Sequence, residues 1–273
     1  MGCEVNDYGN ITYENLQIED IKNMKNLGEI AACTKEVSKK VQSIIKDGRK
    51  CLTLGGDHSI VIGSIDGHVT ALDSDDDIAV LWVDAHADLN TYASSPSGNI
   101  HGMPMAILTR ELSDLWPHLP GMDWQKPRIS LRNLAYIGLR SVDHHERKII
   151  EQFGISAFGM HDIEKYGIVE ITERALEAIN PNKRRSLHVS YDIDSLDSLE
   201  APSTGTAVRG GLTLREGISL LEIIHSTNTL SALDLVEVNP NIGSKEDVRK
   251  TLEAAKHLIK AAFGHSRKGS AMP

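Results

Sequence analysis

Six side chains of the kind that bind metal ions follow three short apolar runs of the sequence. The runs are residues 51–54 (CLTL), 78–83 (IAVLWV) and 187–191 (LHVSY). The six residues are His58, Asp84, His86, Asp88, Asp192 and Asp194. Because ligands of open α/β sheets bind outside the carboxyl ends of the strands, these positions are candidates for a functional site.

The spacing within each cluster favours a shared orientation of its side chains. Asp84, His86 and Asp88 lie at positions i, i+2 and i+4, so an extended backbone directs all three to one face. Asp192 and Asp194 share a face for the same reason. A lone carboxylate at a strand end is more often a helix cap, and a lone histidine more often structural. Six such residues at strand ends favour a metal site.

The charge of this cluster points to two ions rather than one. Four carboxylates that converge without a metal would repel one another and raise one another's pKa values. Two divalent cations would balance the four negative charges. Oxygen-rich sites with one or two imidazoles suit Mn²⁺, Mg²⁺ or Fe²⁺, whereas structural zinc prefers thiolates. Two adjacent ions lower the pKa of a shared water, so the pattern predicts hydrolysis.

The elements that position these residues alternate between helix-like and strand-like patterns from about residue 27. Continuous apolarity in the strand-like runs is typical of parallel strands that helices cover on both faces. Thr213 and Glu216 form a capping pattern that opens a helix. Further helices are expected over 162–179 and 245–263, and further strands over 134–139 and 230–238. The prediction is a single α/β domain over residues 1–273, with a functional or disordered loop between residues 88 and 102.

Composition excludes several classes of protein. The chain has 273 residues, of which 40% are hydrophobic, and its formal net charge is −9. A nucleic-acid or anionic-membrane surface would need clustered Lys and Arg. No apolar run approaches the ~18 residues of a membrane span. Three cysteines are too few and too scattered for a disulfide framework, and the acidic string at 73–77 is expected to be a solvated turn.

Several motifs together resemble the arginase branch of the ureohydrolase family. They are GGDHS (55–59), DAHADLN (84–90), SGNIHG (97–102), SYDID (190–194), TGTAVRGGLTLREG (204–217) and ALDLVEVNP (232–240). The similarity runs from about residue 3 to about residue 268, with the motifs in family order. It implies a three-layer α/β/α fold with a mostly parallel central sheet.

The resemblance implies a binuclear manganese site with two Mn²⁺ per chain. His58, Asp84, Asp88 and Asp192 would hold one ion. Asp84, His86, Asp192 and Asp194 would hold the other, so that Asp84 and Asp192 bridge. The family reaction is the hydrolysis of L-arginine to L-ornithine and urea. A guanidinium is planar, delocalised and protonated at neutral pH, so its carbon needs a strong nucleophile and its charge needs an anion.

The resemblance also implies roles for residues outside the metal ligands. Glu237 matches the carboxylate that pairs with the guanidinium, His101 the proton shuttle, and Thr206 a hydroxyl near the reacting end. Without the resemblance, Glu237 reads as a carboxylate capping a turn and His101 as a loop histidine. The residues that match recognition of the α-carboxylate and α-amino groups are Asn90, Ser97, Asn99 and Asp143.

Departures from the family pattern keep other functions open. Ser141 stands where arginases usually have Asp, which alters a polar contact near the substrate amine. The alternatives are a ureohydrolase for another guanidino compound, of the agmatinase or guanidinobutyrase type, and a catalytically impaired paralogue. The resemblance also implies a homotrimer, with Arg215 and Glu216 at positions that match residues of the subunit interface.

The N-terminus also departs from the family. Arginases generally begin with a further strand, glycine-rich loop and helix before the segment that matches residues 3–10. The resemblance therefore predicts a domain that lacks its first βα unit, with an exposed apolar gap in the sheet and weaker stability. The N-terminus has no signal-peptide pattern, which indicates a cytoplasmic protein, and a mitochondrial location stays open.

Overall fold

The computed structural model describes residues 4–19 and 21–267. Its centre is a six-stranded, all-parallel sheet with the strand order β1-β6-β5-β2-β3-β4. The strands are β1 (Cys51–Leu54), β2 (Ile78–Val83), β3 (Leu134–Leu139), β4 (Ser156–Gly159), β5 (Ser186–Asp192) and β6 (Leu230–Val236). The predicted α/β class with a mostly parallel sheet is confirmed.

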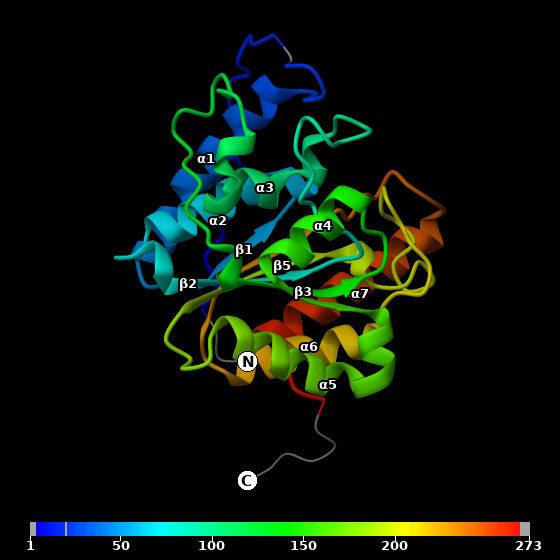
Figure 1. Ribbon diagram of the computed structural model, residues 1–273. Coiled ribbons are helices and arrows are strands. Elements are labelled where there is room, and N and C mark those ends of the chain that lie inside the picture. Colours follow the sequence, from blue (N-terminus) through cyan, green and yellow to red (C-terminus); the bar gives the residue numbers. More distant parts are fainter. Residues whose placement is uncertain (1–3, 20, 268–273) are drawn as a thin grey trace.

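Helices cover both faces of the sheet, which gives three layers (Figure 1). One layer contains α1 (Leu27–Lys46), α2 (Val61–Thr70), α3 (Pro104–Leu108) and α4 (His144–Phe153). The other contains α5 (Met160–Ile179), α6 (Leu214–Ser226) and α7 (Lys245–Ala262). No helix in residues 4–19 and 21–267 is both long enough and apolar enough to cross a membrane.

Strand β2 shows why the sequence forms this sandwich. All six of its residues are buried. Leu81 and Val83 pack in the core on the side of α5, α6 and α7, whereas Val80 and Trp82 pack with α2 and α3 on the opposite side. A strand buried on both faces must be apolar at every position, which is the pattern that the sequence shows.

The parallel register brings distant parts of the chain to one edge of the sheet. Val83 pairs with Tyr191, and Asp192 pairs with Val236. The residues that follow β2, β5 and β6 therefore lie next to one another at the carboxyl edge. This edge carries the predicted metal ligands and Glu237.

Most predicted elements agree with the structure, but the strand predicted over 230–238 ends at Val236, and one helix is not continuous. The capping pair is present, because the Thr213 hydroxyl accepts the N–H of Glu216 at 3.2 Å where α6 begins. Helix α5, predicted as continuous, is interrupted at Gly167, which has φ 80° and ψ 154°. A left-handed φ is accessible to glycine without steric cost, so the chain breaks the helix there.

The acidic string is less isolated than the sequence suggests. Residues Asp75–Asp77 form a 3₁₀ turn before β2. Asp76 pairs with Arg110 at 2.8 Å, and Asp75 lies 3.6 Å from Arg128. These ion pairs are exposed and contribute little to stability. The segment is therefore a solvated turn, as predicted, with two surface ion pairs that the sequence did not indicate.

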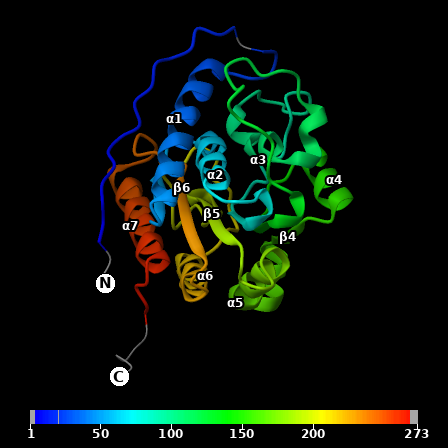
Figure 2. The same ribbon diagram turned by 90° about the vertical axis from the view of Figure 1, so that its left-hand side faces the viewer.

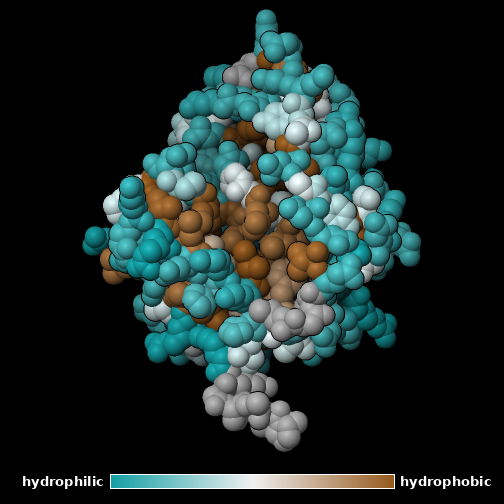
Figure 3. Space-filling view, turned by 180° about the vertical axis from the view of Figure 1, so that it is seen from behind, coloured by the Kyte–Doolittle hydropathy of each residue, from teal (hydrophilic) through white to brown (hydrophobic). Residues whose placement is uncertain are grey.

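Strand β1 lies at one edge of the sheet and pairs only with β6 among the described strands. Residues 4–18 run without helix or strand along α7 and α1 on this side (Figure 2). The face seen from behind Figure 1, where this edge lies, has a hollow of hydrophobic residues (Figure 3). Leu54, at the end of β1, is 67% exposed. An apolar surface thus lies at the sheet edge where β1 has no second neighbour.

Candidate metal centre

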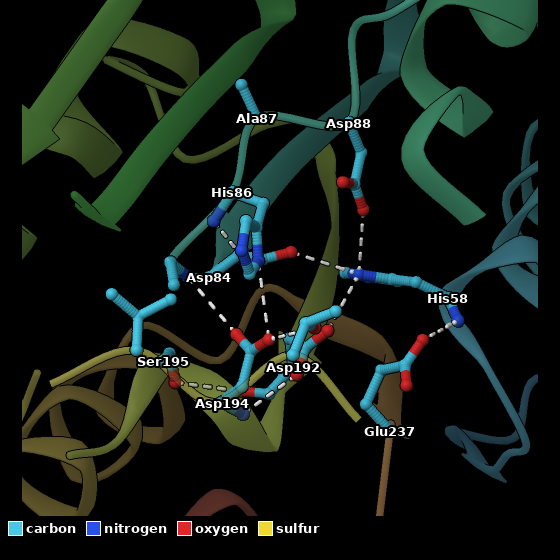
Figure 4. A network of polar contacts seen from close by, with 12 residues as sticks. His58, Asp84, His86, Ala87, Asp88, Asp192, Asp194, Ser195 and Glu237 are labelled. Carbon is cyan, nitrogen blue, oxygen red and sulfur yellow. Dashed lines mark hydrogen bonds and ion pairs between the residues drawn. The ribbon is translucent and has the colours of Figure 1, made fainter. Parts of the chain in front are cut away.

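His58 is the centre of the first group of metal-type side chains. It begins a short 3₁₀ turn after β1 and is buried. Its Nδ1 lies 3.0 Å from Asp84 Oδ2, 3.1 Å from Asp88 Oδ2 and 3.1 Å from Asp192 Oδ2 (Figure 4). Side chains from β1, β2 and β5 thus converge on one point at the carboxyl edge of the sheet.

His86 is the centre of the second group. Its Nδ1 lies 3.3 Å from Asp84 Oδ1 and 3.3 Å from Asp194 Oδ2. The carboxylate of Asp84 therefore faces His58 with one oxygen and His86 with the other. His58, Asp84 and Asp88 can hold one ion, and Asp84, His86 and Asp194 can hold another. A carboxylate shared between both groups is the arrangement that a dinuclear site requires.

Asp192 joins the first group through one oxygen. Its Oδ2 faces His58, whereas its Oδ1 accepts the backbone N–H of Asp194 at 2.8 Å. Asp192 therefore presents Oδ2 to the first group.

The chemistry of these residues fits divalent metal ions. His58 Nδ1 is buried, and none of the nearby carboxylates meets it in hydrogen-bond geometry within the described part of the chain. Neighbouring ligands of an octahedral ion with bonds of ~2.1 Å lie ~3.0 Å apart, which is close to the separations around His58. Oxygen donors with one imidazole per group are ligands that hard and intermediate divalent ions prefer. The two groups therefore suit a dinuclear metal site.

The pKa values of the carboxyl groups reflect their crowding. Burial and the charge of Asp84 raise the pKa of Asp88 to about 6. Burial and neighbouring carboxylates also raise the pKa values of Asp192 and Asp194. Burial acts in the same direction on Asp84, but its close contacts with the His58 and His86 imidazoles outweigh burial and lower the pKa of that group. Three of the four groups thus have the raised values that the sequence analysis expected from mutual repulsion.

Trp82 and Ser190 orient these ligands and were not identified from the sequence. The Trp82 indole stacks on the His58 imidazole with 4.1 Å between ring centroids, and its Nε1–H donates to Asp84 Oδ2 at 2.9 Å. His58 Nε2 lies 2.8 Å from Ser190 Oγ. Trp82 and Ser190 each stand two residues before a ligand, on the same strand face as that ligand. This period of two is the signal that could have identified them.

Glu237 and His101 lie beside the first group. Glu237 follows β6 and has a positive φ of 63°, which is uncommon for a residue with a side chain. Its Oε1 accepts the backbone N–H of His58 at 2.9 Å and lies 3.2 Å from His101 Nδ1. The hydrogen bond to Glu237 raises the pKa of His101, and it outweighs burial to lower the pKa of Glu237. The pair is therefore poised as an imidazolium and a carboxylate.

A cavity of about 170 Å³ opens over both groups. Of the remaining predicted site residues, Thr206, Asn90, Ser97 and Asp143 line it, together with Ser141. The Thr206 hydroxyl donates to Asp194 Oδ2 at 2.8 Å, and Asn90 Nδ2 donates to Asp143 Oδ2 at 2.8 Å. Asn99 is exposed and does not belong to this lining.

Glu146 is a further residue of the cavity that the sequence analysis missed. It is buried and accepts the backbone N–H groups of Leu89 at 2.9 Å and Asp143 at 2.8 Å. Burial raises its pKa to about 7. The spacing of Asp143 and Glu146 at the start of α4 is that of a capping box, and this pattern could have revealed the residue.

The three-layer fold and the paired His/Asp groups define a class of hydrolytic enzymes with a dinuclear metal site. The Arginase family model matches residues 2–264, and the chain belongs to this family. It is 43% identical to human mitochondrial arginase-2 over 98% of this chain and 76% of that protein. It is 42% identical to the hepatic arginase of Aquarana catesbeiana over 97% of this chain and 82% of that protein.

Solved structures agree with this assignment. The arginase of Bacillus subtilis superimposes with a TM-score of 0.84 at 34% identity, over 98% of this chain and 87% of that chain. The arginase of Entamoeba histolytica in complex with L-ornithine superimposes with a TM-score of 0.76 at 30% identity. That match covers 91% of this chain and 82% of the other.

Proposed function

We propose that this protein hydrolyses L-arginine to L-ornithine and urea with two Mn²⁺ ions. The observation that carries the proposal is the carboxylate of Asp84, shared between two His/Asp groups beneath a polar cavity. Similarity to named arginases at 41–44% identity supports the choice of substrate.

The ions would be held by the predicted ligand sets. One set is His58, Asp84, Asp88 and Asp192, and the other is Asp84, His86, Asp192 and Asp194. Imidazole and carboxylate donors suit Mn²⁺ as well as Mg²⁺ and Fe²⁺, and the family resemblance favours manganese. When bound, the two ions would supply a water of lowered pKa as the nucleophile.

Glu237 and His101 would act on the guanidinium. The lowered pKa of Glu237 keeps its carboxylate charged, so it can hold the cationic group of the substrate in the cavity. The raised pKa of His101 favours the protonated form of its imidazole, so it can donate a proton to the departing amine. Thr206, bonded to Asp194, would fix that carboxylate and line the reacting end.

The outer cavity would recognise the amino-acid end of the substrate. The carboxylate of Asp143, oriented by the Asn90 amide, offers an anion for an α-amino group. Asn90, Ser97 and, through water, Asn99 would bind the α-carboxylate. Support for an amino-acid ligand comes from the Entamoeba histolytica arginase, whose structure contains L-ornithine.

An assay of urea release tests the substrate. The manganese-loaded protein is expected to release urea from L-arginine and much less from agmatine or guanidinobutyrate, which lack the α-carboxylate or the α-amino group. Activity on agmatine alone would favour the alternative of an agmatinase-type ureohydrolase. Ser141, which alters the contact near the substrate amine, keeps that alternative open. A protein that binds two Mn²⁺ but releases no urea would be the impaired paralogue. Metal analysis of the same sample separates these outcomes.

We also propose a homotrimer, with Arg215 and Glu216 at the subunit interface. Arg215 is exposed, whereas the Glu216 carboxylate accepts the N–H and O–H of Thr213 within the chain. Sedimentation of the full chain, compared with Arg215→Ala, would measure the oligomeric state. A wild-type monomer would refute this part of the proposal.

Domain organisation and location complete the proposal. The chain would act as a single catalytic domain, which limited proteolysis should leave intact between residues 21 and 267. Its location would be cytoplasmic or mitochondrial, and the names of the mammalian arginase-2 relatives favour mitochondria. Fractionation of cells that express the full-length protein distinguishes the two compartments.

A further inference from the structure

The guanidinium of Arg140 connects three backbone segments near the metal site, at residues 138, 194–196 and 208. Arg140 directly follows β3, and its guanidinium donates only to backbone carbonyl oxygens. The acceptors are Gly138 (3.2 Å), Asp194 (2.6 Å), Ser195 (3.1 Å), Leu196 (3.2 Å) and Val208 (2.8 Å). Among residues 4–19 and 21–267, no carboxylate forms an ion pair with it. Its contacts therefore fix backbone positions rather than neutralise a charge.

The carbonyl contacts converge on Asp194. Nη2 of Arg140 binds the backbone oxygen of Asp194 and that of Val208. Thr206, two residues before Val208, donates to the carboxylate of Asp194 at 2.8 Å. Arg140 thus holds the backbone of Asp194 directly, and it holds the segment whose hydroxyl orients the Asp194 side chain.

The main chain of Arg140 extends this support to His86. The N–H groups of Arg140 and Ser141 both donate to the carbonyl oxygen of Ala85 at 3.0 Å. Ala85 lies between Asp84 and His86 in the sequence. Arg140 therefore contacts the backbone of Asp194 itself and the residue between Asp84 and His86. These three residues are the members of the second metal group. His58 and Asp88, in the first group, have no such contact in the described residues.

Only a guanidinium meets this geometry. Its N–H groups are fixed in a plane and can donate in several directions at once, whereas a lysine ammonium is a single flexible point. The neighbouring backbone is also shaped around it, because a Cβ on Gly211 would lie 2.6 Å from Arg140 Nη2. A side chain at position 211 would therefore clash with Arg140.

We propose that Arg140 is a positioning residue that sets the affinity of the second metal group, Asp84–His86–Asp194, without touching substrate. The proposal rests on the dinuclear site described under the proposed function. It predicts an asymmetric effect: loss of Arg140 weakens the ion beside His86 and spares the ion beside His58.

The test is Arg140→Lys, which keeps the charge and removes the planar donors. Arg185→Lys is a matched control, because Arg185 also donates to carbonyl oxygens, those of Asp76 and Ile179, but at the opposite end of β5. Each protein is titrated with Mn²⁺, and bound metal is counted after equilibrium dialysis and by electron paramagnetic resonance. Removing an outer-shell partner typically lowers metal affinity 10–100-fold, so we expect this loss at one ion of two.

The outcomes distinguish the proposal from its alternatives. In Arg140→Lys the signal of a coupled ion pair should give way to that of a single ion, and adding Asp88→Ala should remove the remaining ion. Arg185→Lys should bind both ions as the wild type does. Any of four results would overturn the proposal. Arg140→Lys could bind both ions tightly or bind both with equally weakened affinity. Arg185→Lys could show the same loss, or the wild type could bind fewer than two ions.

A second variant covers a failure to fold. If a thermal melt without metal shows that Arg140→Lys is unfolded, Arg140→Gln, which keeps one amide donor group, takes its place. It should weaken binding of the same ion. A wild type that binds two ions but releases no urea would refute the proposed arginase activity and leave this metal titration valid. The two failures are thus separable.

Discussion

The imidazole of His101 and the carboxylate of Glu237 form a pair, with 3.2 Å between Nδ1 and Oε1, at the edge of the metal site. Each shifts the pKa of the other toward the charged form. The same Glu237 oxygen accepts the backbone N–H of His58 at 2.9 Å. The pair therefore places a carboxylate and a protonatable imidazole on one side of the metal ligands.

Replacement of His101 should separate proton transfer from metal binding. His101→Asn removes the titrating group, and general acid catalysis typically contributes ~10²–10⁴-fold, so kcat should fall by about that factor. Metal content should not change, because His101 belongs to neither ligand group. In the wild type, activity should fall as pH rises through the raised pKa of His101. Steady-state kinetics with metal analysis checks this, and an unchanged kcat would remove His101 from the mechanism.

Asp84 and Asp88 should differ in how many ions they hold. Asp84 faces both histidines, whereas the Asp88 carboxylate faces only His58. Asp84→Ala should therefore lose both ions and all urea release, and Asp88→Ala chiefly one ion. The exposed Asp114 provides a control, since Asp114→Ala should bind two ions. If Asp84→Ala keeps two ions, the shared-carboxylate geometry is not the metal site.

Asn23 braces the loop that carries Ser97. Its Nδ2 donates to Tyr92 O at 3.1 Å, and the N–H of Lys25 donates to Gly98 O at 2.9 Å. Gly98 has a φ of 73°, and a Cβ there would lie 3.1 Å from the Asn23 backbone. The segment therefore holds both ends of residues 92–98.

Loss of this brace should affect substrate recognition and not chemistry. A hydrogen bond contributes about 1 kcal/mol, so Asn23→Ala should raise the KM for L-arginine by about fivefold with kcat and metal content unchanged. If the protein has some activity on agmatine, the KM for agmatine should not change, because agmatine has no carboxylate for the Ser97 loop to bind. Equal increases for both substrates would contradict the role of the loop in carboxylate recognition.

Local spacing accounts for only part of each metal group, and the rule that ligands bind at the carboxyl ends of parallel strands accounts for His58 and Asp194, which join Asp84 from other strands. Asp84 and His86 follow one strand, and their shared face results from the period of two. The pairing of His101 with Glu237 spans 136 residues, so no local pattern reveals it, and only the family resemblance brought both residues into the site. Arg140 could not be identified for the same reason, since four of its five acceptors lie at least 54 residues away.

A buried pair of histidines beneath the sheet should govern acid stability. His68 Nδ1, on α2, lies 3.1 Å from His188 Nδ1, and His68 Nε2 lies 2.8 Å from Ser186 Oγ. Burial, followed by the charge of His188, lowers the pKa of His68 to about 3 from the ordinary 6.5. The folded chain keeps His68 neutral where the unfolded chain binds a proton, so this group lowers the stability as pH falls from about 6.5 to about 3.

His68→Gln should therefore flatten the pH dependence of unfolding. Between pH 6.5 and pH 4 the free energy of unfolding of the wild type should decrease more steeply than that of the variant, by up to ~1.4 kcal/mol per pH unit. Urea denaturation of the metal-free proteins at several pH values measures both slopes. His257→Gln, on the exposed face of α7, should retain the wild-type slope. Parallel slopes for His68→Gln and the wild type would contradict this prediction. They would mean that His68 binds its proton in the folded chain as readily as in the unfolded chain.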